Sequence, residues 1–417
     1  MLSVAECVEA IIDYRGKTPP KSPIGIPTLT AANVKNGRID KSSISFVSHE
    51  TYEAWTTRGL PAPNDVLITT EAPVGEVAPF PGDQTYLITR RLIALRAKRN
   101  QVDPAFLLYT LLNPETKERL LSGARGSTVP RVLKTDITGL QISVPDIGVQ
   151  RSIASLLRAI DDKIELNRRM NETLEAMARA IFKDWFVDFG PTRAKAEGRP
   201  PYLAPEIWDL FPDAVDEEGM PVGSRQGTLA DVADSPRRGV SPADVAEDTP
   251  YIGLEHMPRR SIALSEWEGA GKVTSNKSVF KKGEFLFGKL RPYFHKVGFA
   301  PLSGICSTDI VVVVPRAPEW GAYTLACLSS DEFVDYTDQT STGTKMPRTS
   351  WKTMGQYKVC LPSAQITRAF QNLVQPLLDR MRANIHEART LAQTRDLLLP
   401  KLMSGEIRLR DAEKAVT

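Results

Sequence analysis

The chain has 417 residues, which is enough for roughly two or three domains of about 150 residues each. Apolar residues make up 41% and charged residues 25%, and this excludes a disordered or collagen-like chain. The 53 Lys and Arg residues exceed the 50 Asp and Glu residues by only three, so any surface for an acidic ligand must come from the placement of charges and not from bulk charge.

Metal sites and membrane spans are not expected. The four cysteines, at positions 7, 306, 327 and 360, form no Cys-x-x-Cys pair and predict neither a zinc ribbon nor a disulfide framework. The longest uniformly apolar run, residues 310–314, is too short to cross a membrane. Acidic residues close to the start, at positions 6, 9 and 13, are atypical of a signal peptide, so we expect a cytoplasmic protein.

Residues 1–147 are predicted to form a first globular domain of mixed α and β structure. Short apolar runs bounded by Gly and Pro, at residues 66–69 and 92–95, predict strands, and residues 106–112 predict a short helix. This composition of short elements is typical of an α+β domain.

Residues 148–187 are predicted to form a long helix. Apolar residues and asparagines recur at alternating spacings of four and three for more than four heptads, which is the pattern of a coiled-coil seam. At 1.5 Å per residue, a helix of about 37 residues is about 55 Å long. The predicted seam residues are Ile153, Leu157, Ile160, Ile164, Asn167, Leu174 and Ile181.

Residues 188–224 are rich in Pro and Gly and predict a linker extended along the surface. Within it, Arg199-Pro-Pro-Tyr202 resembles the Asn/Asp-Pro-Pro-Tyr signature of amino-methyltransferases. The first residue of that signature accepts hydrogen bonds from the target amine, and Arg has only donors. We therefore interpret the string as linker. Phosphate-binding loops and nucleophile elbows do not occur in the sequence, so we predict no catalytic residue.

Residues 225–363 predict a second α+β domain, and residues 364–417 a second long helix with a tail. Strands are expected at residues 285–287 and 310–314, and a short helix at 323–328. Pro376 lies inside the helical pattern and predicts a kink or a break. The predicted seam residues of this helix are Val374, Leu377, Met381, Asn384, Leu391 and Leu398.

Neither long helix can bury its apolar stripe alone, so we expect the two to pack together as an antiparallel coiled-coil spacer. In that arrangement Asn167 and Asn384 lie near the two midpoints, and we expect them to pair and fix the register. Arg395 interrupts the seam, which indicates a helix end that faces a partner instead of the other helix.

The two halves repeat each other. The string from Gly126 to Arg131 and the string from Gly343 to Arg348 coincide at an offset of 217 residues, and the match continues without gaps through a strand and into the long helices. Chance similarity between two unrelated α+β domains is the alternative. The predicted fold is therefore α+β, with two similar globular domains, each followed by a long helix.

A duplicated chain without a reaction centre is predicted to be a binder that reads two similar features at a fixed distance. Basic residues recur in equivalent loops of both halves, and Arg and Lys bind both phosphates and guanine edges. Taken singly, each of these residues is better explained as a solvated surface charge, and it is their recurrence in equivalent loops that favours binding. The predicted DNA-contacting residues are Arg15, Lys17, Lys21, Arg125, Thr128, Arg131, Lys134, Arg237, Arg238, Lys289, Arg291, His295, Lys345, Arg348 and Lys352.

Over essentially its full length the chain resembles the specificity (S) subunit of type I restriction–modification systems. Asp161-Asp-Lys-Ile-Glu-Leu-Asn167 and Ile181-Phe-Lys-Asp-Trp-Phe186 are similar to the central helical region of that family. Leu397-Leu-Leu-Pro-Lys-Leu-Met-Ser-Gly-Glu-Ile407 is similar to its C-terminal helical region. Gly25-Ile-Pro-Thr-Leu29 and Asn33-Val-Lys-Asn-Gly37 resemble the opening of a target-recognition domain.

The resemblance implies a DNA-recognition subunit without catalytic activity of its own. Each globular domain would read one half of a bipartite, asymmetric site in double-stranded DNA, and the paired helices would set the gap between the halves. Two modification (M) subunits would dock and carry S-adenosylmethionine for adenine-N6 methylation of a flipped base. Two motor-nuclease (R) subunits, which use ATP, would join for restriction. This chain would hold no cofactor and contact no membrane.

Three alternatives stay open. The chain could serve a methyltransferase-only or type IIB-like system that lacks a motor subunit. It could be a self-contained methyltransferase that uses the Arg199-Pro-Pro-Tyr202 string. It could also be a coiled-coil scaffold that does not read DNA.

Overall fold

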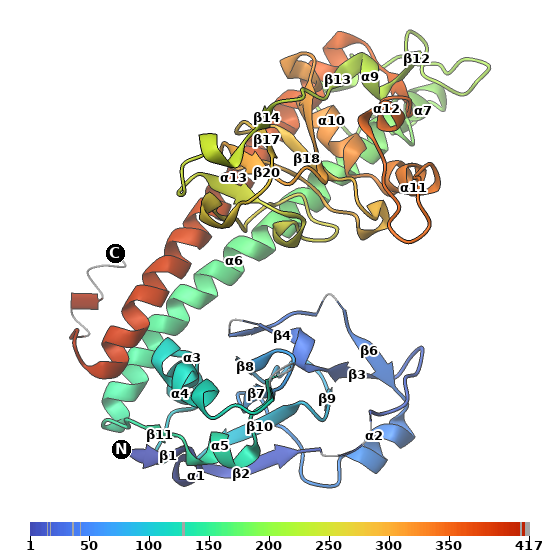
Figure 1. Ribbon diagram of the computed structural model, residues 1–417. Coiled ribbons are helices and arrows are strands. Elements are labelled where there is room, and N and C mark those ends of the chain that lie inside the picture. Colours follow the sequence, from blue (N-terminus) through green and yellow to red (C-terminus); the bar gives the residue numbers. More distant parts are fainter. Residues whose placement is uncertain are drawn as a thin grey trace. The chain divides into compact units, whose positions relative to one another are not determined.

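The computed structural model describes residues 1–14, 16, 18–35, 37–41, 43–126, 130–408 and 411–412 (Figure 1). Arg15, Lys17 and Thr128, all predicted DNA contacts, lie outside the described residues. The chain divides into two compact units: unit 1 is residues 1–163 with 391–417, and unit 2 is residues 164–390. Each unit includes part of both long helices, whereas the predicted domain limits treat each helix as a separate segment.

Unit 1 contains two main sheets. The larger has the order β2-β10-β7-β8 and is antiparallel throughout, and the smaller has the order β6-β3-β9 with β3 and β9 parallel. Leu29, Leu67 and Tyr86 are almost fully buried in the core between them. Its strands are β1 Leu2–Ser3, β2 Val8–Asp13, β3 Ile26–Leu29, β4 Val34–Lys35, β5 Arg38–Ile39, β6 Ser45–Val47, β7 Val66–Thr70, β8 Val74–Pro79, β9 Leu87–Ile88, β10 Leu92–Ala97 and β11 Gln141–Ile142.

Helices α3 and α4 pack against the larger sheet of unit 1. The helix α3 begins after Asp103, whose carboxylate accepts hydrogen bonds from the first-turn N–H groups, and proline occupies its first position. Seven of its residues are buried, and it packs against β7, β8 and β10. The helices are α1 Val4–Cys7, α2 His49–Trp55, α3 Pro104–Leu112, α4 Pro114–Ser122 and α5 Lys134–Gly139.

Unit 2 repeats this topology. Its antiparallel sheet has the order β13-β21-β18-β19, and in its second sheet β15 pairs antiparallel with β16 and parallel with β20, as β3 does with β6 and β9. The strands are β12 Arg225–Thr228, β13 Ala233–Asp234, β14 Gly239–Val240, β15 Pro250–Ile252, β16 Glu268–Gly269, β17 Lys277–Phe280, β18 Phe285–Gly288, β19 Val297–Phe299, β20 Gly304–Cys306, β21 Ile310–Pro315 and β22 Lys358–Leu361.

The predicted duplication and α+β fold are confirmed. The strands predicted in both halves correspond to β7, β10, β18 and β21, and the short helices correspond to α3 and α10. The two units also differ, because β14 and β17 extend the second sheet of unit 2 beyond β20. The short helices of unit 2 are α7 Gly190–Ala196, α8 Pro205–Trp208, α9 Leu229–Val232, α10 Gly321–Leu328, α11 Asp331–Gln339 and α12 Trp351–Met354.

The segment 188–224 is not the extended surface linker that its composition predicted. It forms α7 and α8, and Trp208 and Phe211 are buried in unit 2. The ring of Phe211 lies edge-on to that of Trp185, with centroids 5.0 Å apart. Burial of these large aromatic side chains outweighs the bias of Pro and Gly toward an extended chain.

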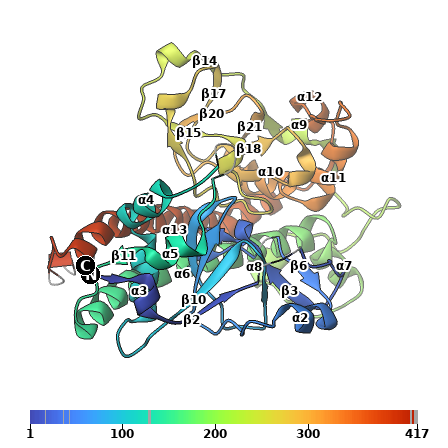
Figure 2. The same ribbon diagram turned by 60° about the horizontal axis from the view of Figure 1, so that its bottom comes forward.

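The two long helices are α6 (Ile147–Phe186) and α13 (Ala364–Ser404), and they lie side by side in both views (Figures 1 and 2). Their starts differ by 217 residues, the offset of the sequence repeat. The predicted seam residues are buried or half-buried, and none is exposed. The helices run antiparallel, because Asn167 of α6 contacts Glu387 of α13, while Phe182, further along α6, lies beside Phe370, earlier on α13.

One prediction about the seam is wrong, and of the kink or break predicted at Pro376 the break does not occur. Helix α13 passes through Pro376 without a break, and the buried Val374 and Leu378 on either side hold it in the core of unit 2. Asn384 does not pair with Asn167. It donates to Asn171 Oδ1 at 2.9 Å, one turn further along α6, while Asn167 donates to Glu387 Oε2 at 2.9 Å. The register is therefore displaced by about one turn from the predicted one.

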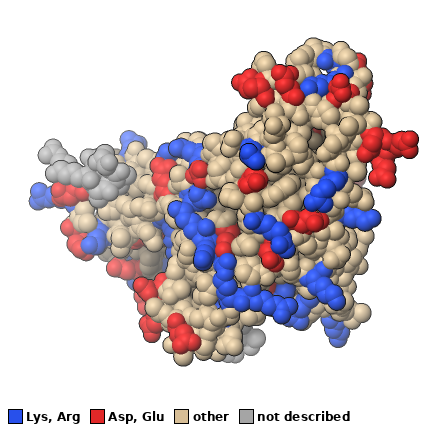
Figure 3. Space-filling model, turned by 90° about the horizontal axis from the view of Figure 1, so that it is seen from above, with Lys and Arg blue, Asp and Glu red and all other residues tan. Residues whose placement is uncertain are grey.

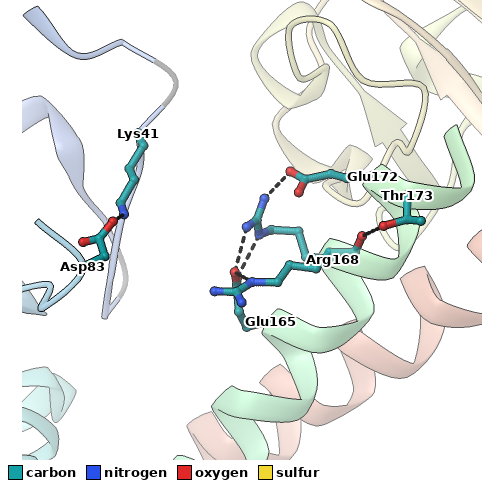
Figure 4. A network of polar contacts seen from close by, with 7 residues as sticks. Lys41, Asp83, Glu165, Arg168, Glu172 and Thr173 are labelled. Carbon is teal, nitrogen blue, oxygen red and sulfur yellow. Dashed lines mark hydrogen bonds and ion pairs between the residues drawn. The ribbon is translucent and has the colours of Figure 1, made fainter. Parts of the chain in front are cut away.

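The exposed face of α6 carries ion pairs within the helix. Arg168 contacts both Glu165 and Glu172, and Arg169 Nε lies 2.8 Å from Glu165 Oε1 (Figure 4). The hydrogen bond from Arg168 lowers the pKa of Glu165 to about 2. Exposed pairs of this kind contribute at most about 1 kcal/mol each, so they keep this face polar and do not decide the fold. Among the described residues, no helix is both long and apolar enough to cross a membrane.

Candidate nucleic-acid interface

In each unit a loop that contains glycine lies against the connection between two paired strands. These strands are β7 and β8 in unit 1 and β18 and β19 in unit 2. We use "glycine loop" for residues 125–131 in unit 1, of which 125, 126, 130 and 131 are described, and for residues 342–348 in unit 2. In both loops the first and last residues form an antiparallel bridge, Arg125 with Arg131 and Thr342 with Arg348. Gly343 has φ +99°, and an added Cβ would lie 3.2 Å from the Met346 carbonyl oxygen, so any other residue would be strained there.

The neighbouring hairpin is joined to each glycine loop through equivalent backbone bonds. Arg131 bridges to Glu71 and Arg348 bridges to Leu290. The residue after each of these arginines donates a backbone hydrogen bond to the same hairpin. The Val132 N–H donates to the Thr70 oxygen at 3.0 Å, and the Thr349 N–H donates to the Lys289 oxygen at 3.1 Å. The structure thus brings together two segments that the sequence predicted separately, 289–295 and 343–352.

Arg131 and Arg348 occupy equivalent places but have different electrostatic surroundings. Arg91 and Asp309 also occupy equivalent places. The Arg91 carbonyl accepts a 2.9 Å hydrogen bond from the Thr70 N–H, and the Asp309 carbonyl accepts a 2.9 Å hydrogen bond from the Lys289 N–H. In unit 1, Arg91 Nε lies 2.6 Å from Glu71 Oε1. In unit 2, Asp309 Oδ1 lies 3.3 Å from Arg348 Nε.

Because the place of Arg91 in unit 1 is taken by Asp309 in unit 2, only one of the two equivalent arginines, Arg348, has a carboxylate partner among the described residues. The described part of the chain places no carboxylate within ion-pair distance of Arg131, which is exposed, whereas Arg348 has Asp309. A cation without a carboxylate partner can bind an anion without first breaking an ion pair. Arg131 is therefore the better candidate for a phosphate contact.

The other predicted contacts fall into two groups. Lys134 Nζ lies 3.8 Å from the buried Asp13, which also binds Arg58 at 3.0 Å, and Arg238 contacts both oxygens of the buried Glu284 at 2.8 Å. These two cations stabilise their own units. The remaining predicted residues are exposed or half-buried at the surface: Lys21, Arg125, Arg237, Lys289, Arg291, Lys345 and Lys352.

His295 is wrongly predicted as a DNA contact. Its side chain is almost fully buried, and its Nε2 lies 3.0 Å from the Ser329 carbonyl oxygen. Burial lowers the pKa of His295, against the opposing effect of the hydrogen bond with the Ser329 carbonyl. The ring is a neutral packing element that anchors the loop between β18 and β19.

That loop also holds residues that the prediction missed. The Arg259 guanidinium carbon lies 4.1 Å from the centroid of the Phe294 ring. Tyr293 packs edge-on against Phe294, with ring centroids 4.8 Å apart. Met346, on the adjacent glycine loop, is also exposed. The sequence signal was present, because two aromatic residues stand between basic ones in a loop already singled out for its charge.

The surface charge is patchy. On the face in Figure 3, Lys and Arg side chains gather in groups separated by uncharged surface and by Asp and Glu. Burial raises the pKa of the Cys306 and Cys327 thiols to about 12, so neither is activated as a nucleophile.

Comparison with known proteins places this geometry in context. A family model described as the type I restriction modification DNA specificity domain matches residues 14–176. The specificity subunit of the type I restriction enzyme HindI from Haemophilus influenzae is 25% identical over 378 residues, which cover 77% of this chain and 81% of that protein. The MjaIX specificity subunit from Methanocaldococcus jannaschii is 25% identical over 368 residues, covering 83% of this chain and 78% of that protein.

A solved structure shares the fold. The S subunit of a type I restriction–modification system from M. genitalium aligns over 96% of this chain and 94% of its own length, with a TM-score of 0.53 and 16% sequence identity. At that identity the likeness supports the architecture of duplicated domains and long helices.

Proposed function

Because the chain belongs to the family of type I restriction–modification specificity subunits, we propose that it is the DNA sequence-recognition subunit of such a complex. It reads a bipartite, asymmetric site, one half with unit 1 and the other with unit 2. It docks two adenine-N6 methyltransferase (M) subunits, which carry S-adenosylmethionine, and motor-nuclease (R) subunits, which use ATP, join for restriction.

One observation carries this proposal: the two units have the same topology but different side chains at equivalent loop positions. Glu71 and Arg91 in unit 1 correspond to Leu290 and Asp309 in unit 2. A shared scaffold with divergent loops suits a reader of two different half-sites, because base contacts specify sequence while the scaffold only positions them. Helix α6, with 40 residues, is about 60 Å long, which exceeds the length of one DNA turn of about 34 Å.

The proposal is tested by mapping methylation. The chain is co-expressed with its M subunit in a host without adenine methylation, and the DNA is sequenced by a method that detects N6-methyladenine. We expect one asymmetric motif made of two parts with a fixed gap. Exchange of residues 1–147 for those of another family member should then change one part only.

A negative result is informative if the complex is shown to be assembled and to hold S-adenosylmethionine. In that case the absence of any methylated motif would favour the scaffold alternative over DNA reading. A symmetric motif would contradict the assignment of different half-sites to the two units.

Arg131→Ala is expected to weaken DNA binding by the complex about tenfold at low salt, because it removes one phosphate contact. The slope of log affinity against log salt should fall by about 1. The matched control is the double variant Asp309→Ala/Arg348→Ala, which removes a neutral pair from the equivalent place and should change affinity less than about twofold. Titration of DNA binding between low and moderate salt measures both. An equal loss in the double variant would show that Arg348 leaves Asp309 to bind DNA.

A further inference from the structure

Tyr293 is an exposed aromatic residue in a loop that is otherwise held firmly. It lies in a short turn between Arg291 and His295, and 49% of its surface is exposed. Pro292, directly before it, and His295, two residues after it, are buried. Among the described residues, Tyr293 contacts one other ring, that of Phe294, and no hydrogen bond holds its hydroxyl group.

The backbone around Tyr293 is fixed at both ends. Arg291 and His295 both have left-handed conformations, with φ +51° and +50°, which non-glycine residues adopt only where their surroundings impose it. The Arg291 N–H donates to the Pro347 oxygen at 2.8 Å, and the His295 ring contacts the Ser329 carbonyl. The loop therefore presents the Tyr293 ring in a defined place instead of letting it collapse onto the surface.

The surroundings of the ring are cationic and apolar. The Arg259 guanidinium covers Phe294, and Arg291 Nη2 lies 3.4 Å from the Lys345 carbonyl oxygen, which ties the loop to the glycine loop. Met346 on that loop is 48% exposed. An aromatic ring with cations beside it matches nucleic acid, because the ring contacts a base or a thymine methyl group while the cations contact phosphates.

Unit 1 has no such residue at the equivalent place. Three residues, 71–73, connect β7 to β8, against eight, 289–296, between β18 and β19. The short turn carries Ala72 and Pro73 at its exposed positions and has no aromatic side chain. The aromatic contact would thus act on one half-site only.

We propose that the Tyr293 ring contacts a base in the half-site read by unit 2 and helps to determine its sequence, with Arg291 and Lys345 at the adjacent phosphates. This inference rests on the proposed function. It is specific to DNA: the alternative occupant of an exposed aromatic tip, a surface of the M subunit, is an outcome of the test.

The experiment uses the co-expressed complex with its M subunit and compares Tyr293→Ala, Tyr293→Phe and Tyr202→Ala. Tyr202 is the matched control, since it is 51% exposed in the same unit but lies outside the glycine loop and the β18–β19 loop. Methylation rate is measured on a set of duplexes with every single substitution in the motif. Assembly with M is measured by size-exclusion chromatography.

Tyr293→Ala is expected to slow methylation of the cognate site about tenfold, or to relax discrimination at a base pair within one half. That half should be the one that changes when residues 225–363 are exchanged for those of another family member. Tyr293→Phe and Tyr202→Ala should stay within about twofold of the unmodified complex.

Three results separate the possible failures. If the unmodified complex methylates no motif, the proposed function itself fails. If it methylates a motif and Tyr293→Ala changes neither rate nor discrimination, the Tyr293 proposal is overturned. If Tyr293→Ala fails to assemble with M while Tyr202→Ala assembles, the residue belongs to a protein interface and the proposal is also overturned.

Discussion

Phe370→Ala is expected to lower the free energy of unfolding of unit 2 by about 3–5 kcal/mol. Phe370 is fully buried near the start of α13. Its ring lies 5.0 Å from that of Phe186 and 5.8 Å from that of Trp185, both at the end of α6. The truncation removes buried apolar area and leaves a cavity where the two helices and the second domain meet.

Hydrogen exchange measured on the full chain tests this prediction, because it reports on each unit separately. Amide groups of β21 should lose protection, while those of β10 in unit 1 should not. Leu373→Ala is the control, since Leu373 lies one turn further along α13 and is 39% exposed. It should cost less than about 1 kcal/mol. Equal loss of protection in both units would contradict the assignment of Phe370 to the core of unit 2.

Arg395→Ala is expected to destabilise unit 1 by about 2–3 kcal/mol, less than the 3–5 kcal/mol of a fully buried pair because Asp161 is partly exposed. Arg395 Nη1 lies 2.7 Å from Asp161 Oδ1, and the Tyr109 hydroxyl donates to the other oxygen of that carboxylate at 2.7 Å. The prediction that Arg395 faces a partner is therefore wrong. It joins α13 to α6, and Tyr109 joins both to the first domain.

A double-mutant cycle with Asp161→Ala isolates this contact in the full chain. If the pair is the source of the loss, Arg395→Ala should cost much less in the Asp161→Ala background, as judged by protection of unit 1 amides. Lys35→Ala serves as the control, because its pair with Asp40 is exposed and should contribute less than about 1 kcal/mol. Losses that simply add would show that Arg395 stabilises unit 1 by packing alone.

The sequence determined the features that depend on local pattern. The spacing of apolar residues from Ile153 to Ile181 and from Val374 to Leu398 predicted both long helices, because a buried stripe at heptad spacing requires a helix. The repeated strings predicted equivalent domains, since similar local sequences at a constant offset fold into the same order of elements. The glycine loops were found in this way, and both form the same bridges.

Only the tertiary structure decided which partner each side chain meets. His295 and Arg238 looked like surface cations, yet the first is buried against Ser329 and the second binds Glu284, 46 residues later in the chain. The same holds for Asn384, whose partner depends on a register that a repeating seam leaves open by a turn. A charged side chain in a loop has the same local sequence signal whether it faces water or a distant carboxylate. Arg131 and Arg348 match in sequence, and the three-dimensional placement of Glu71 and Asp309 leaves only the first of them without a carboxylate partner among the described residues.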